Sequence, residues 1–107
     1  GFEQIAGIFE ETAENEKEHA KVFFKYLEKS GGNAVEITAE YPAGKIGTVI
    51  ENLLAAAEGE KMEWGTLYPE FGKVAKDEGY DEIASSFKEI AEVEEKHEKR
   101  YRKFLRM

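Results

Sequence analysis

The chain has no cysteine, two prolines and a shortage of positive charge. Without cysteine it can form no disulfide, no thiolate metal site and no cysteine nucleophile. With 15 basic against 23 acidic residues and a net charge of −8, it is a poor partner for nucleic acid or for an anionic membrane surface. It also lacks an apolar run of membrane-spanning length and a signal-peptide pattern, so we expect a cytoplasmic protein.

Glutamate, lysine and alanine dominate the residues that are present, which is typical of an all-α protein. A chain of this length allows one small domain, and we expect residues 1–107 to form it. Apolar residues at spacings of three and four predict three helices. Their expected ranges are about 2–29, 48–78 and 81–106.

A long crossover over residues 30–47 separates the first two predicted helices. It begins at Ser30-Gly31-Gly32, where glycine is expected to end the first helix. Residues 35–39 alternate like a short strand, and Tyr41-Pro42 follows as a turn signal. One long crossover is a feature of ferritin-like four-helix bundles, whereas simple up-down bundles use short loops.

Local signals also mark the ends of the second and third helices. Thr48 and Glu51 form a capping-box pattern at the start of the second helix. Pro69 is expected to kink that helix or to tighten it locally, and Gly79 to end it. Asp81 is expected to cap the third helix. The apolar stripe predicted for the second helix is Val49, Leu53, Ala56, Trp64, Leu67, Phe71 and Val74.

Residues 1–27 and 79–105 are similar to one another without a gap, and both copies contain Glu-x-x-His. The two copies of this motif are Glu16 with His19, and Glu94 with His97. Residues three apart share one face of a helix, so each copy can present a carboxylate and an imidazole to one site. Two such pairs on two similar helices predict a two-metal site with internal pseudo-symmetry.

Glu60 and Glu63 interrupt the apolar stripe of the second helix at about the same distance from its start as Glu16 and Glu94 lie from theirs. All four could meet in one layer of a bundle. Four buried carboxylates would cost several kcal/mol per charge without compensation, and two divalent cations supply it. Carboxylate with imidazole suits iron or manganese, whereas calcium would not need the histidines.

A plainer interpretation remains for each of these residues. A single Glu-x-x-His is usually a solvated helix face, and a glutamate-rich chain contains such motifs by chance. Tyr68, near the face of Glu63, fits a packing role as well as a catalytic one. Trp64 is expected to pack, and Glu98, like most other glutamates, to be solvated.

At these residues the chain resembles the rubrerythrins, non-haem di-iron proteins of the ferritin-like superfamily. The resemblance spans nearly the whole chain. Its motifs are AENEKEH (residues 13–19), AAAEGEKMEW (55–64), LYPEF (67–71) and AEVEEKHEKRY (91–101). The fold that it implies is an all-α, ferritin-like four-helix bundle, with three of the four helices and one long crossover in this chain.

The resemblance also implies an activity and a set of roles. Two ferrous ions would reduce hydrogen peroxide to water, and an external, rubredoxin-type donor would restore them; manganese or zinc can substitute for iron. Glu16 and Glu94 would bridge the metals. Glu60 and Glu63 would be terminal ligands and His97 a permanent one. His19 would exchange with Glu63 on redox change, and Tyr68 would hydrogen-bond near the site.

Two departures from the family pattern shape the expected partners. The family's first helix, with its own glutamate ligand, is absent ahead of residue 1, so we expect a helix supplied in trans and a homo-oligomer, as a dimer or a domain-swapped form. The rubredoxin-like domain with its paired Cys-x-x-Cys motifs is also absent. Any turnover therefore needs a separate donor.

Three alternatives to a peroxidase remain open at this point. The chain could be a metal-binding helical fragment or assembly without turnover. It could be a ferroxidase or oxidase that uses dioxygen. It could also be a purely structural bundle, which added ferrous or manganous ions would not stabilise.

Overall fold

The computed structural model of the chain describes residues 2–41 and 43–107. The chain divides into two compact units, Gly1–Tyr41 and Pro42–Met107. The described residues form helices, turns and one long connection, and they contain no strand. The predicted all-α class is therefore confirmed. None of the described helices combines the length and the apolar character that crossing a membrane requires.

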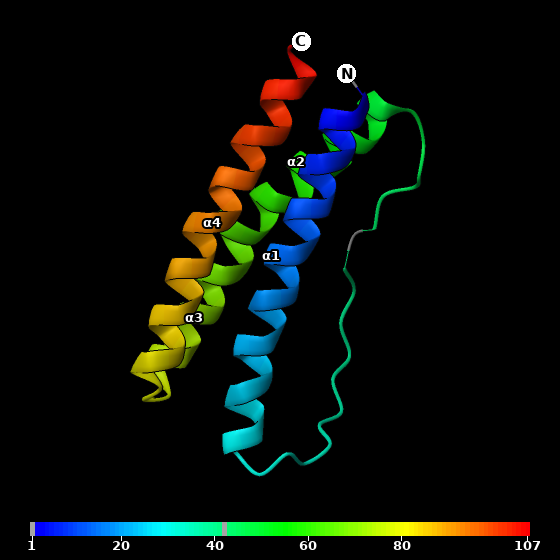
Figure 1. Cartoon of the computed structure of the whole chain (residues 1–107). Coiled ribbons are helices and arrows are strands. Elements are labelled where there is room, and N and C mark those ends of the chain that lie inside the picture. The colour runs from blue at the N-terminus through cyan, green and yellow to red at the C-terminus, as the bar shows by residue number, and fades with distance from the viewer. Residues whose placement is uncertain (1, 42) are drawn as a thin grey trace. The chain divides into compact units, whose positions relative to one another are not determined.

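The first unit consists of one long helix, α1 (Phe2–Lys29), and the chain that follows it (Figure 1). Ile8 and Thr12 are its buried residues, and the Thr12 hydroxyl donates to the Ile8 carbonyl at 2.7 Å. The helix ends as its glycines predict. Gly31 has φ 107°, and the Gly32 N–H reaches back to the Leu27 carbonyl at 3.2 Å, which is the Schellman arrangement.

The connection after α1 does not contain the short strand suggested by residues 35–39. Val35 and Ile37 are 71% and 75% exposed, so the alternating pattern covers no apolar face and has no partner strand to bond to within the described residues. Pro42, part of the predicted turn, and Gly1, the first residue of the repeat, lie outside the described residues.

The second unit begins with α2 (Val49–Met62), which opens at the predicted capping box. The Glu51 N–H donates to Thr48 Oγ1 at 3.1 Å, and the Thr48 N–H donates to Glu51 Oε2 at 2.9 Å. Asn52 adds a second reciprocal pair with the backbone of Gly47. These bonds satisfy N–H groups that a helix start leaves open, and they fix where α2 begins.

The helix predicted over residues 48–78 has a widened turn in its middle. After α2, the π-helical turn η1 (Glu63–Leu67) leads into α3 (Tyr68–Asp77). The Tyr68 N–H donates to the Glu63 carbonyl five residues earlier. Pro69 follows at once and has no N–H for the regular ladder. The local change expected at Pro69 is thus a wider turn and not a tighter one.

The widened turn changes which residues of α3 are covered. Phe71 and Val74, predicted on the inner stripe, are 38% and 53% exposed, and that part of the prediction is wrong. Ala75 is buried instead, and Gly72 lies so close to α4 that a Cβ there would meet Phe87 Cβ at 3.6 Å. A π turn holds one residue more than an α turn, so the inner face continues one position later in sequence.

A tight turn at Gly79 reverses the chain into α4 (Asp81–Leu105). Gly79 has φ 88°, and the Tyr80 N–H donates to the Ala75 carbonyl at 2.8 Å. Asp81 does not cap α4 as predicted, because Tyr80 holds the N-cap position without a side-chain bond and Asp81 is already helical. There its charge still suits the positive end of the helix dipole.

Within the second unit, α2 and α3 lie end to end along α4 (Figure 1). The two rods form the antiparallel helical hairpin that the short turn at Gly79 requires. Its buried apolar residues come from both rods, and they are Leu53, Ala57, Ala75, Ile90 and Tyr101. This core holds Glu60 opposite α4.

Candidate metal centre

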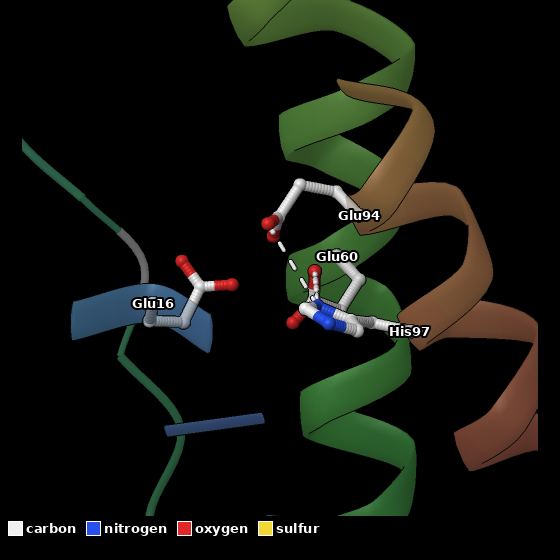
Figure 2. Close-up of side chains that lie close together, drawn as sticks. All are labelled: Glu16, Glu60, Glu94 and His97. Carbon is white, nitrogen blue, oxygen red and sulfur yellow. Dashed lines mark ion pairs between the residues drawn. The ribbon is translucent and has the colours of Figure 1, made fainter. Parts of the chain in front are cut away.

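Three of the predicted ligands meet in the second unit. Glu60 comes from α2, and Glu94 and His97 come from α4; Figure 2 shows their side chains pointing toward one another. His97 Nδ1 lies 3.5 Å from Glu60 Oε2 and 3.7 Å from Glu94 Oε1. One ligand atom of each residue lies within 4.8 Å of the others. We refer to these three residues as the Glu60–Glu94–His97 cluster.

Helix geometry explains why these side chains converge. Glu94 and His97 are three positions apart, so they share the inner face of α4 with Ile90 and Tyr101. Glu60 continues the inner face of α2. The residues of the Glu60–Glu94–His97 cluster are 8%, 0% and 4% exposed, in that order. Two carboxylates are therefore held out of water, which costs several kcal/mol each unless a positive charge compensates them.

The cluster has a composition that suits a divalent metal, and its separations of 3.5 and 3.7 Å are slightly longer than those of ligands bound to one cation. Glu60 Oε2 is buried and accepts no hydrogen bond from the described residues. Its 3.5 Å separation from His97 Nδ1 is too long for a hydrogen bond between these atoms. Two ligands each ~2.1 Å from one cation lie roughly 3.0–3.4 Å apart. Mixed oxygen and nitrogen donors suit iron and manganese, so the residues fit the predicted metal.

Glu63 and Tyr68 lie at the two ends of the widened turn. Glu63 is half-buried and is not one of the residues of the Glu60–Glu94–His97 cluster. Tyr68 is also half-buried, with its ring centroid 5.8 Å from that of Phe87 and 6.5 Å from that of Phe71. The aromatic contacts fix the Tyr68 ring. The roles predicted for both residues stay predictions.

The other two predicted ligands belong to the first unit. On α1, His19 Nδ1 lies 3.5 Å from Glu16 Oε2, and the two side chains are 13% and 37% exposed. The equivalent atoms of Glu94 and His97 are 3.7 Å apart. Both copies of Glu-x-x-His thus have the same local geometry, as their common position in the repeat predicts.

Sequence analysis missed a polar network beside the cluster. Glu98, expected to be solvated, is 8% exposed. Its Oε1 accepts a bond from Trp64 Nε1 at 2.7 Å, and its Oε2 accepts one from Arg102 Nε at 2.6 Å. Arg102 Nη2 also donates to Glu58 Oε1 at 3.2 Å. The Glu98/Arg102 spacing of four is the signal that could have drawn attention to this pair.

This network keeps a buried carboxylate ionised. Burial alone would raise the pKa of Glu98. The hydrogen bonds from Arg102 and Trp64, with the charges of Arg102 and Lys61, outweigh it and lower the pKa. The same bonds to Glu98 and Glu58 raise the pKa of Arg102. A charged hydrogen bond is stronger than a neutral one, so the network is a firm link between α4 and the rod beside it.

Comparison with known proteins gives one family. The sequence model of the rubrerythrin family matches residues 1–105. The chain is 59% identical over 101 residues to a rubrerythrin of Porphyromonas gingivalis. The matched region covers 94% of this chain and 49% of that protein. It is 51% identical over 106 residues to a rubrerythrin of Nitratidesulfovibrio vulgaris, covering 99% of this chain and 54% of that one.

A more distant match is a nigerythrin of Nitratidesulfovibrio vulgaris, 30% identical over 101 residues, with 94% of this chain and 49% of that protein covered. The chain thus spans about half the length of the curated relatives that it matches. The similarity covers both units, including both copies of Glu-x-x-His.

Proposed function

The chain belongs to the rubrerythrin family, and from this premise we propose that it is the di-iron domain of a peroxidase that reduces hydrogen peroxide to water. The observation that carries the proposal is the Glu60–Glu94–His97 cluster, in which a wholly buried carboxylate lies beside a buried carboxylate and a buried imidazole. Such a group is costly in a protein that binds no cation.

We assign six ligands to the two metals. Glu60, Glu94 and His97 come from the second unit, and Glu63 is added from the widened turn. Glu16 and His19 from α1 complete the set, supported by the repeat that relates them to Glu94 and His97. Four glutamates carry four negative charges, which two divalent ions neutralise, so the assignment is balanced in charge.

Two bound ferrous ions would supply the two electrons with which hydrogen peroxide and two protons become two waters. The protein's own part is to hold the metal ions and to shield them from water. The buried carboxylates of Glu60 and Glu94 and the buried imidazole of His97 would keep water from the metals on the α2/α4 side. We assign to Tyr68, whose ring contacts Phe87 and Phe71, the role of offering a hydroxyl to an oxygen of the substrate. Replacing it by phenylalanine should slow peroxide reduction and leave metal binding intact.

The electrons must enter from outside residues 1–107. These residues contain no cysteine, and a rubredoxin-type iron centre needs four thiolates. We therefore propose a rubredoxin-type donor, in another chain or in another domain of a longer protein, and an oligomer that supplies a further helix to α1.

The test is an anaerobic titration with ferrous ion, followed by oxidation. We expect two irons per chain, and faster oxidation of the bound ferrous iron by hydrogen peroxide than by dioxygen at equal concentration. Glu92→Gln, on the exposed side of α4, is the control for a change of charge alone. Faster oxidation by dioxygen would make the chain a ferroxidase or oxidase, and absence of tight iron binding would remove the proposal.

A further inference from the structure

One hydrogen bond joins the immediate neighbours of two proposed ligands. Trp64 follows Glu63 in η1, and Glu98 follows His97 in α4. Trp64 Nε1 donates to Glu98 Oε1 at 2.7 Å across the two rods. We propose that the Trp64–Glu98 bond is a positioning device of the metal centre, which fixes the backbone of Glu63 relative to His97. The inference rests on the proposed function.

The bond is anchored at its outer side. Arg102 Nε donates to the second oxygen of Glu98 at 2.6 Å, and the arginine is held in turn by Glu58 at 3.2 Å. Glu98 therefore has a partner on each oxygen and cannot rotate without losing one of them. Its side chain is 11% exposed, so water competes little for these bonds, and a charged acceptor makes them strong.

The position of the bond in the fold explains its use. A π turn is rare and interrupts the regular α-helical hydrogen-bond ladder. Trp64 is the second residue of η1 (Glu63–Leu67), so its indole ties this turn of the α2–η1–α3 rod to α4. The tie lies at the level of the Glu60–Glu94–His97 cluster. A shift of η1 would move Glu63 together with Trp64.

Groups that orient ligands without touching a metal have a measurable effect. Removing such a partner from a metal site typically lowers metal affinity about 10–100-fold. A residue that only packs would lower the stability of the metal-free protein and leave the geometry around the metal unchanged. The two roles therefore differ in the spectrum of the bound ion, which reports coordination directly.

The experiment uses the full chain with Co²⁺ as the probe, under anaerobic conditions. Trp64→Phe keeps an aromatic ring but removes the N–H donor together with part of the indole, and the melting temperature reports the packing that is lost. Glu98→Gln keeps the shape and removes the charge. Glu92→Gln is the matched control, because it removes one carboxylate charge from the exposed side of α4. Cobalt affinity, the visible absorption spectrum of the bound ion and the melting temperature of the metal-free chain are measured for each variant and for the double variant.

We expect Trp64→Phe to lower cobalt affinity about 10–100-fold and to change the cobalt spectrum. Glu98→Gln should act in the same direction, and the double variant should lose less than the sum of both, since they share one bond. Glu92→Gln should match the wild type. If both single variants melt earlier but keep the wild-type affinity and spectrum, the bond is structural only and the inference fails.

A different result concerns the proposed function. If the wild-type chain itself takes up no cobalt or ferrous ion, the proposed metal centre is wrong and the inference fails with it. The two failures are distinguishable, because one appears in the wild type and the other only in the comparison with its variants.

Discussion

At the scale of single residues, charged side chains in the interior of the second unit lower its stability. Glu94 is completely buried and Glu60 nearly so, in positions where the neighbouring turns place Leu53, Ala57 and Ile90. An apolar side chain at either position would suit the metal-free fold better. A bound cation is the compensation that we propose for these carboxylates.

Glu94→Gln should separate these two effects. Without metal we expect the variant to be more stable than the wild type by ~1–3 kcal/mol, because a buried charge is removed at nearly constant volume. With ferrous or manganous ion the order should reverse, since binding stabilises only the protein that holds the ligand. Chemical denaturation with and without metal measures both quantities.

The control for this variant is Glu92→Gln, two positions away on the exposed side of α4. It should change neither stability by more than about 0.5 kcal/mol. A metal-free Glu94→Gln chain that is less stable than the wild type would mean that the native protein compensates the carboxylate without a cation.

At this scale, sequence reasoning anticipates which side chains are buried where one helix face decides it. Glu94 and His97 follow from their spacing, and Glu60 from its place among apolar residues. Glu98 does not follow, because its burial depends on Trp64 and Arg102 reaching the same carboxylate from two rods. A pattern along one helix contains no information about a partner on the next.

At the scale of elements, glycine sets where the rods end. Gly79 has φ 88°, a backbone conformation that costs a residue with a Cβ about 1–2 kcal/mol. Gly59, inside α2, has ordinary helical geometry, and a Cβ there would meet nothing within 4 Å. The same substitution should therefore have opposite effects at the two positions.

Gly79→Ala should lower the free energy of unfolding by ~1–2 kcal/mol because of its positive φ. Gly59→Ala should raise it by up to ~1 kcal/mol, since alanine has the higher helix propensity. Thermal melts of the two metal-free variants beside the wild type measure the difference. Equal effects of both substitutions would contradict the assignment of the α3–α4 turn.

The capping box and the glycine ends were predictable because each depends on a few neighbouring residues. The π turn was not. Pro69 predicts that the regular helix is interrupted. Whether the helix narrows, bends or widens there depends on how η1 packs against α4. Phe71 and Val74 are exposed because the helix widens at η1. The predicted inner face is therefore wrong from this turn to the end of α3.

At the scale of the whole molecule, the proposed centre takes ligands from both units. Glu16 and His19 precede the long connection, and the Glu60–Glu94–His97 cluster follows it. The repeat supports this proposed division of ligands, and a physical separation of the units can test it. Lys45 lies exposed in the connection, outside any helix.

Limited trypsin treatment should cut first after Lys45, because helical backbone resists proteolysis better than exposed irregular chain. We expect the two pieces of the cut chain to elute together from a sizing column when ferrous or manganous ion is present, and to separate when a chelator removes it. Co-elution that ignores the chelator would mean that packing alone joins the pieces. Separation in the presence of metal would contradict a shared centre.

The extra residue in η1 has a consequence for anyone who aligns this protein with others. Before residue 63 the buried positions recur with the period of an α-helix. After residue 67 they recur with the same period, displaced by one residue. A relative with one residue fewer at this turn could have the same amino-acid sequence in α3 and yet bury a different face of that helix. Positions matched by sequence across the turn are then not matched in space, and a substitution tolerated in one protein becomes a core change in the other.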